Sequence, residues 1–252
     1  MTTSTQGLAF EQAAADYAAN RPSYPPALID AVEDLAGRPV AGARVADVGA
    51  GTGLGTALLH ARGAHVVAVE PGPMMAAQLR RTLPGVSLVR GDGNRLPLAS
   101  ASVDLVTYAQ AWHWTDPARS VPEARRVLRP GGALALWWND QDSTDGWAAA
   151  QLARVRRFLG AEDDANQGPP DLMVRFRRLP PGLDFGRRQV AWTRRVTVGT
   201  HLANLASYSD FLVRDADTVA AFLAAERDHL SALFPGGTLE EKYVVSLAVA
   251  RP

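Results

Sequence analysis

The stretch Asp47-Val48-Gly49-Ala50-Gly51-Thr52-Gly53 decides the fold of this chain, because it ends an apolar run and opens a predicted helix. Glycine has no Cβ, so it tolerates positive φ and lets a ligand approach the backbone closely. A second apolar run follows and ends in an acidic residue, Glu70. A carboxylate in that place can accept hydrogen bonds from both hydroxyls of a ribose. The glycine-rich stretch and Glu70 together predict a nucleoside-binding site at a strand-to-helix turn.

The spacing of the glycines differs from the fingerprint of proteins that bind dinucleotides. That fingerprint is G-x-G-x-x-G, and its third glycine packs the helix against the strand beside a pyrophosphate. A match that begins at Gly49 would end on Leu54, and one that begins at Gly51 would end on Thr56. Neither reading frame satisfies the pattern, and the chain instead carries an acidic residue followed by G-x-G-x-G.

This acidic residue with G-x-G-x-G closely resembles motif I of the class I S-adenosylmethionine-dependent methyltransferases. Three further sites resemble that family in the same order along the chain: Glu70, the stretch Gly91-Asp92-Gly93 and residues 126–132. The resemblance covers residues 10–138. It implies S-adenosylmethionine as the cofactor, S-adenosylhomocysteine as the product and no metal. It also implies that Glu70 binds the ribose and that Asp92 lies near the adenine amino group.

The N-terminal region resembles one branch of that family, the trans-aconitate-type methyltransferases. The matching residues are Tyr17 and the stretch Arg21-Pro22-Ser23-Tyr24-Pro25, which in that branch close over the methionine end of the cofactor. Arg21 is then expected to pair with the cofactor carboxylate, because a guanidinium presents two parallel donors. The alternative is a turn that only ends a helix. The whole implied cofactor set is Tyr17, Arg21, Asp47, Gly49, Ala50, Gly51, Gly53, Glu70, Pro71, Met74, Gly91, Asp92, Gly93, Ala109 and Gln110.

Short apolar runs alternate with helical patterns as far as residue 138. The predicted strands cover residues 44–48, 65–69, 86–89, 103–108 and 133–138. The predicted helices cover residues 53–61, 73–82 and 117–128, the last with Asp116 as its N-cap. This alternation predicts an α/β fold with buried parallel strands. We expect a doubly wound, Rossmann-like seven-stranded sheet with helices on both faces, and ligands beyond the carboxyl ends of the strands.

The alternation breaks after residue 138, where the chain becomes rich in Asp, Gly and Pro. Residues 139–186, with one helix at 147–159, are predicted to be an inserted helical cap over the carboxyl ends of the strands. Residues 8–36 are predicted to form N-terminal lid helices. A strand at 189–198, a capped helix at 215–233 and a strand at 243–250 complete the chain. The prediction is one methyltransferase domain over residues 1–252.

The fourth predicted strand leads into Tyr108-Ala109-Gln110-Ala111-Trp112-His113-Trp114, at the end of the sheet where cofactor and substrate meet. Five of the six tryptophans fall at or just after two strand ends, which favours an apolar or planar acceptor. The alternative is ordinary core packing of the aromatic rings. The predicted acceptor-binding residues are Tyr24, Trp112, Trp114, Trp138 and Asn139.

His113 is the predicted catalytic residue, because a neutral imidazole could take the proton of an attacking hydroxyl or amine. His60 and His65 are expected on the opposite side of the sheet, and His201 and His229 in helices. A histidine that only packs or bonds locally is the alternative. Rival bases at the next strand end are Asp140, Asp142 and Asp145. A strong base is optional, since methyl transfer from a sulfonium depends mainly on positioning and on excluding water.

Composition narrows the classes of partner. The 252 residues contain 26 Lys and Arg against 26 Asp and Glu, so no positive field favours nucleic acid. The chain has no cysteine, which excludes disulfides, thiolate metal sites and a cysteine nucleophile. The first residues carry no secretion signal and no apolar run reaches membrane-spanning length, so a cytoplasmic location away from membranes is expected. The oligomeric state stays open.

The sequence therefore predicts methyl transfer from S-adenosylmethionine to a small organic acceptor. Oxygen is the expected site of methylation, and nitrogen and carbon are the alternatives. The Asn-Pro-Pro-Tyr motif of enzymes that methylate amino groups in nucleic acids or proteins is absent after the fourth strand. Two alternatives stay open: a cyclisation or rearrangement that uses the bound cofactor without methyl transfer, and a cofactor-binding protein without catalysis. A role in specialised metabolism is a further expectation.

Overall fold

The computed structural model describes residues 20–144, 146–160, 176 and 179–252. Among these, the chain divides into two compact units. The sheet unit contains residues 23–139, 176, 179–190 and 245–252, and the insertion unit contains residues 20–22, 140–144, 146–160 and 191–244. Parts of the predicted lid and cap, together with Tyr17 and Asp145, lie outside the described residues. The assignment of all these residues to one domain remains a prediction.

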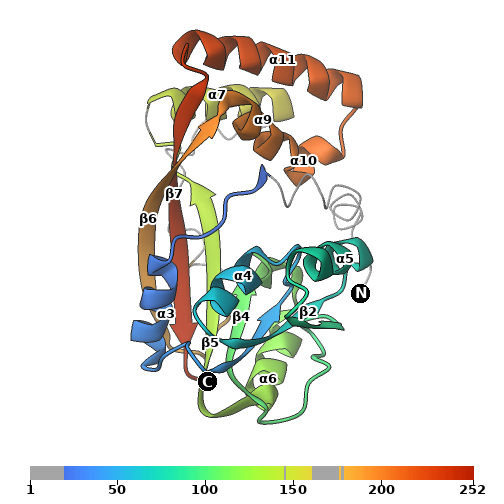
Figure 1. Ribbon diagram of the computed structural model, residues 1–252, viewed down its shortest axis with the longest axis vertical. Helices are drawn as coiled ribbons and strands as arrows, with labels where there is room; N and C mark the ends of the chain where they lie inside the picture. The colour runs from blue at the N-terminus through green and yellow to red at the C-terminus, as the bar shows by residue number, and fades with distance from the viewer. Residues whose placement is uncertain (1–19, 145, 161–175, 177–178) are drawn as a thin grey trace. The chain divides into compact units, whose positions relative to one another are not determined.

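Seven strands form one sheet in the order β3-β2-β1-β4-β5-β7-β6 (Figure 1). Their bounds are β1 Arg44–Val48, β2 His65–Glu70, β3 Ser87–Arg90, β4 Val103–Ala109, β5 Leu128–Gln141, β6 Phe185–Thr197 and β7 Thr238–Ala250. The first five strands pair in parallel, whereas β7 runs against β5 (Figure 1). The predicted seven-stranded, Rossmann-like α/β fold is confirmed.

Helices cover both faces of the sheet unit. Alternate residues of a strand point to opposite faces, so the neighbours of two consecutive residues of β4 show which helix lies on which face. Tyr108 of β4 belongs to the buried cluster that includes Val127 of α6. The next residue, Ala109, contacts Gly55 of α4, so α4 and α6 pack on opposite faces. The helices of this unit are α3 Ala27–Ala36, α4 Leu54–Ala61, α5 Pro73–Thr82 and α6 Pro117–Val127, with a 3-10 turn η1 at Trp112–Trp114.

The link from β3 to β4, residues 91–102, contains no helix, and the side chain of one arginine forms hydrogen bonds with it. Arg126 of α6 donates to the carbonyls of Leu98 at 2.8 Å and Leu96 at 3.0 Å. Glu123 accepts from the N–H of Leu96 at 2.8 Å and also pairs with Arg126. These bonds therefore hold the loop to Arg126, the first residue of the stretch 126–132 that carries part of the family resemblance.

Strand β5 is longer at both ends than the predicted strand 133–138. The polar residues after Trp138 led us to expect the insertion from residue 139. The backbone instead stays in the sheet to Gln141, and the N–H of Asp142 then donates to the carbonyl of Lys242 at 2.8 Å. Main-chain hydrogen bonds thus continue the strand through polar residues. The first residues of the predicted cap, 139–141, therefore belong to β5.

The insertion unit has its own hydrophobic core, which includes Leu202, Leu230 and Leu239. Its helices are α7 Gly146–Leu159, α9 Val198–Ala206, α10 Ser209–Leu212 and α11 Ala216–Leu233. The predicted helices at 147–159 and 215–233 are therefore confirmed. Asp215 caps α11 by accepting from the N–H of Thr218 at 2.8 Å.

Asp47, at the centre of the sheet unit, is fully buried and accepts two hydroxyl hydrogen bonds. Thr56 of α4 donates to one oxygen at 2.6 Å, and Thr107 of β4 donates to the other at 2.8 Å. Burial raises the pKa of Asp47 from 3.8 to about 6, although both hydroxyls lower it. The carboxylate holds the first turn of α4 against β1 and β4, directly beneath the glycine loop.

This raised pKa predicts how stability depends on pH. Because the folded state disfavours the ionised form, the unfolding free energy should fall as pH rises from about 4 through 6, by roughly 3 kcal/mol in all. Asp47→Asn keeps both hydroxyl partners but cannot ionise, so it should lack this contribution. Urea unfolding of both proteins between pH 4.5 and 7.5 measures the difference.

Asp228→Asn, on an exposed position of α11, serves as the control for the same change of charge. It should follow the wild-type pH dependence. A wild type and an Asp47→Asn variant with parallel profiles would contradict the assignment.

Candidate functional site

The glycine loop after β1 adopts a backbone that only glycine accepts without strain. Gly49, Gly51 and Gly53 have φ of +67°, +59° and +95°. A Cβ on Gly49 would lie 2.5 Å from the Cβ of Ala111, whereas a Cβ on Gly51 would meet nothing within 4 Å. The loop is thus packed at its ends and open at its middle. Ala50 is buried, and its carbonyl accepts from the N–H of Gly53 at 2.9 Å.

Gly55 is a closely packed residue of this region that the sequence analysis did not identify. A Cβ there would lie 2.9 Å from the Cβ of Ala109 and 3.4 Å from a carboxylate oxygen of Asp47. The absence of a side chain lets the first turn of α4 approach the sheet, as the third glycine does in dinucleotide-binding folds. The sequence could have identified Gly55, because it continues the run G-x-G-x-G-x-G that begins at Gly49.

Glu70, at the end of β2, joins two loops through its carboxylate. One oxygen accepts from the N–H of Gly51 at 2.7 Å and the other from the N–H of Gly72 at 2.8 Å. Burial raises its pKa, and the two N–H groups oppose that rise. Each oxygen of a carboxylate has two lone pairs, so each can accept one further hydrogen bond. The carboxylate is therefore fixed in place and still able to bind a diol.

The residues after β2 and β3 extend this region. The carbonyl of Pro71 accepts from the Arg90 guanidinium, and Met74, 48% exposed, stands in the first turn of α5. Asp92 accepts from the N–H of Asn94 at 2.7 Å. Gly91 and Gly93 pack closely, since a Cβ would lie 2.7 Å from Pro97 in the first case and 2.9 Å from Thr115 and Tyr108 in the second. A cavity of about 670 Å³ borders Gly91 and Asp92.

At the end of β4, Gln110 has a φ of +59°, which is strained for a residue with a side chain. Its N–H donates to the carbonyl of Trp137 at 2.9 Å, and its side-chain amide donates to the carbonyl of Asn139 at 3.0 Å. Asn139 in turn donates to the carbonyl of Ser23 at 3.4 Å. These bonds bring the ends of β4 and β5 together with the segment that carries Tyr24. Ala109, beside them, contacts the first turn of α4.

The tryptophans near this end take different roles. Trp112 and Trp138 are buried in the core cluster, and Trp112 makes an edge contact with Tyr108 at 4.9 Å between ring centres. Trp114 is 42% exposed. Trp137, which was not singled out, is fully buried and meets Tyr24 edge-on at 6.0 Å. The packing alternative thus holds for Trp112 and Trp138, and contact with an acceptor stays a prediction for all five predicted residues.

His113 lies in the 3-10 turn η1 after β4, where its side chain is exposed. Its ring is 4.8 Å from that of Trp114. Of the rival bases, Asp142 accepts from the N–H and hydroxyl of Thr144 at 3.2 and 2.7 Å, as expected of a loop residue. Asp140 is the penultimate residue of β5. His113 therefore combines access to solvent with a place at the carboxyl end of a central strand.

Arg21 belongs to the insertion unit, and its surroundings there are defined. Its guanidinium donates to the carbonyl of Ser207 at 3.2 Å and lies 4.4 Å from the centre of the Tyr208 ring. Tyr17, its predicted companion, lies outside the described residues. Contact of Arg21 with a cofactor carboxylate stays a prediction.

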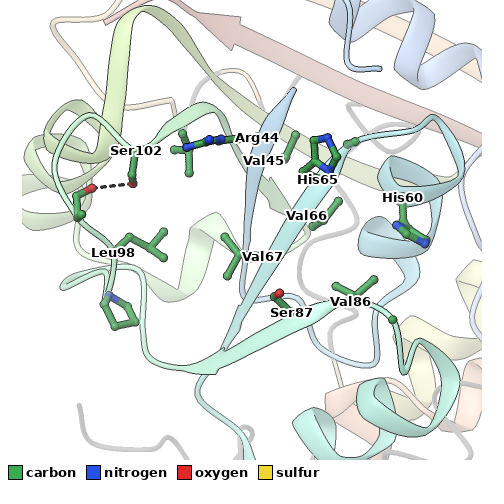
Figure 2. A pocket seen from close by; sticks show the side chains of 15 residues that line it. Arg44, Val45, His60, His65, Val66, Val67, Val86, Ser87, Leu98 and Ser102 are labelled. Carbon is green, nitrogen blue, oxygen red and sulfur yellow. Dashed lines mark hydrogen bonds between the residues drawn. The ribbon is translucent and has the colours of Figure 1, made fainter. Parts of the chain in front are cut away.

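A second cavity, of about 560 Å³, lies at the opposite end of the parallel strands (Figure 2). Arg44, His65 and Ser87, which begin β1, β2 and β3, line it together with His60. His60 and His65 are thus away from the carboxyl ends, as predicted. Among the described residues, no group of three or more His, Cys, Asp or Glu could hold a metal, and no helix is long and apolar enough to cross a membrane.

Known proteins match both the sequence and the fold. The model of a methyltransferase domain matches residues 46–136. A protein of Mycobacterium tuberculosis named as an uncharacterized methyltransferase is 44% identical over 192 residues, which cover 75% of this chain and 72% of the relative. The match to the methyltransferase domain spans the glycine loop and Glu70.

Two solved structures extend the comparison. The structure of a putative type II methyltransferase from Anaeromyxobacter dehalogenans has a TM-score of 0.67 and 25% identity, covering 92% of this chain and 97% of that one. A methyltransferase from Thiobacillus denitrificans in complex with S-adenosylhomocysteine has the same fold, with a TM-score of 0.52, 19% identity and coverage of 97% and 98%. With the glycine loop and the Glu70 carboxylate in place, the chain belongs to the class I S-adenosylmethionine-dependent methyltransferases.

Proposed function

We propose that this chain binds S-adenosylmethionine at the carboxyl ends of β1, β2 and β4 and transfers its methyl group to an oxygen atom of a small organic acceptor. The observation that carries the proposal is the carboxylate of Glu70, held by the N–H groups of Gly51 and Gly72. Its remaining lone pairs match the two hydroxyls of a ribose. The product is then S-adenosylhomocysteine.

The residues around Glu70 also fit the cofactor. The hydroxyl of Thr52 is buried and has no hydrogen-bond partner among the described residues. The Cβ position of Gly51 faces open space, so a nucleoside can approach the backbone there. By resemblance, Asp92 accepts from the adenine amino group, and Met74 belongs to the same cofactor-binding set. Ala109, Gln110, Arg21 and Tyr17 take the methionine end, and the remaining residues of the predicted set form the loop.

The chemical task of the protein is mainly to position the reactants. When bound, the cofactor supplies a methyl group on a positively charged sulfur, which is a good leaving group. Gln110 and Asn139 tie the ends of β4 and β5 together, which fixes the floor where acceptor oxygen and methyl carbon must align. Exclusion of water by the surrounding aromatic rings favours attack by the acceptor. His113 takes the acceptor proton on a ring nitrogen.

A small acceptor is favoured by charge and by the site residues. The chain has equal numbers of acidic and basic residues, so it lacks the field that a nucleic acid substrate requires. Tyr24, Trp114 and Asn139 offer aromatic and amide contacts, while Trp112 and Trp138 support them from the core. Membership of the trans-aconitate-type branch, a cytoplasmic location and a place in specialised metabolism belong to the same proposal.

A screen of carboxylates, phenols and amines tests the reaction. Mass spectrometry should detect S-adenosylhomocysteine and an equal amount of an O-methylated product in one of the first two groups. Methylation confined to amines would contradict the choice of oxygen. An acceptor that is rearranged without release of S-adenosylhomocysteine would contradict methyl transfer.

Replacement of Glu70 tests the cofactor site. Glu70→Gln loses one acceptor and the negative charge, so the affinity for S-adenosylmethionine in calorimetry should fall at least about tenfold. Glu240→Gln, an exposed glutamate of β7, is the control and should bind as the wild type does. Equal affinities of the two variants would remove Glu70 from the site.

Replacement of His113 tests the proposed base. His113→Ala should lower kcat by about 100-fold and leave the KM for S-adenosylmethionine unchanged, because a general base acts on the acceptor alone. His65→Ala changes an exposed histidine at the opposite end of the sheet and should keep full activity. If the kcat of His113→Ala equals that of the wild type, His113 is not the base and only packs against its neighbours.

A further inference from the structure

A buried network of charged side chains crosses the insertion unit, and the proposed function does not account for it. It joins five elements through side chains that share ion pairs or hydrogen bonds. Its members are Gln151 and Arg154 of α7, Arg194 of β6, His201 of α9, Glu226 of α11 and Glu241 of β7. Four of them, Gln151, His201, Glu226 and Glu241, are at most 4% exposed. Buried charges persist only when they are paired, so the protonation of each group is constrained by its neighbours.

The Glu226 end of the network fixes the orientation of Gln151. Arg154 makes a bidentate pair with Glu226, one of its two bonds at 2.9 Å, so Glu226 is an ionised acceptor. Gln151 lies 3.1 Å from a carboxylate oxygen of Glu226 and must present its amide NH₂ group there. Its carbonyl oxygen therefore faces the other way, toward His201.

Both ring nitrogens of His201 then face acceptors. Nε2 lies 2.9 Å from the carbonyl oxygen of Gln151, and Nδ1 lies 2.6 Å from Oε1 of Glu241. Glu241 is ionised, because Arg194 donates to its other oxygen, as does the hydroxyl of Tyr243 at 3.0 Å. Burial would raise the pKa of Glu241, but His201 and Arg194 hold it below its usual value. A neutral imidazole has one donor only, so this geometry requires the imidazolium.

Other groups around the histidine agree with a positive ring. Trp147 of α7 meets it edge-on at 5.2 Å between ring centres, and no cationic side chain of the described residues pairs with it directly. Tyr243, whose pKa is raised by burial, remains a neutral donor. Asn204 of α9 donates to the Tyr243 hydroxyl at 3.4 Å. The acidic groups that face His201 thus come from β7 directly and from α11 through Gln151.

The network ends on the segment that carries Arg21. Besides Glu241, the Arg194 guanidinium donates to the carbonyl of Asn20 through both terminal nitrogens, at 3.2 and 3.3 Å. The next residue, Arg21, donates to the carbonyl of Ser207 and lies over the ring of Tyr208. The position of Arg21 therefore depends on Arg194, whose own orientation is set by the charge of Glu241.

We infer that His201 is a buried imidazolium, and that through Glu241 and Arg194 it positions Arg21 to receive the carboxylate of the cofactor. His201 and Arg194 are positioning residues, since neither needs to touch a ligand. The second half of this inference rests on the proposed function, and the first half does not.

The protonation of His201 can be measured directly. Nitrogen-15 NMR of the full chain at pH 7, with the His201 ring assigned through its backbone, should show hydrogen on both ring nitrogens. The exposed ring of His229 on α11 serves as the internal reference for the ring-nitrogen chemical shifts. A His201 ring with one unprotonated nitrogen at pH 7 would overturn the first half. This measurement needs no substitution, so it stands even if a variant fails to fold.

The positioning role is tested with S-adenosylhomocysteine in calorimetry. Arg194→Lys keeps an ion pair with Glu241 but not the fork that also reaches Asn20, so the Kd should rise about tenfold. Arg227→Lys, the same change at an exposed position of α11, should bind as the wild type does. In the methyltransferase assay, Arg194→Lys should raise the KM for S-adenosylmethionine with little change in kcat.

A double-mutant cycle separates positioning from general loosening. If Arg194 acts through Arg21, the effects of Arg194→Lys and Arg21→Lys on the Kd should not add. Additive effects, or an unchanged Kd in Arg194→Lys, would overturn the second half. A wild type that does not bind S-adenosylhomocysteine would instead overturn the proposed function, with the NMR result unaffected.

Discussion

The carboxylate of Glu70 is the interaction on which the site depends. It accepts from Gly51 and Gly72, which belong to the loops after β1 and β2. A buried carboxylate must be hydrogen-bonded, so these bonds fix the two loops with respect to each other. Gly51, which donates one of these bonds, is also the glycine whose Cβ position is open. In the proposed function, recognition of the cofactor depends on this pairing more than on the glycines alone.

The two units of the chain stabilise buried charge in opposite ways. In the sheet unit, two hydroxyls and no cation among the described residues hold Asp47, so burial leaves its pKa raised, and the hydroxyl of Thr56 keeps α4 close to the strands. In the insertion unit, burial would raise the pKa of Glu241, but His201 and Arg194 lower it, and the hydroxyl of Tyr243 also donates to the carboxylate. The first arrangement allows close packing of backbone, and the second joins elements that are far apart in sequence.

Local sequence patterns predicted the strands β1 to β4, the glycine loop and the N-cap of α6 at Asp116, because each depends on neighbours along the chain. The length of β5 was underestimated, since pairing with β7 continues through polar residues. The close packing of Gly55 could not be predicted from the sequence, because it depends on the distance between α4 and Ala109. The His201 network could not be foreseen, because its members lie between residues 151 and 241 and meet only through tertiary packing.

Calorimetric titration of the purified protein with S-adenosylmethionine and, separately, with NAD tests the central claim most directly. We expect binding of S-adenosylmethionine with a Kd in the micromolar range and no heat with NAD. That result would support the roles given to Gly49, Gly51, Gly53 and Glu70. Binding of NAD alone would contradict the account of the site while leaving the α/β fold unchanged.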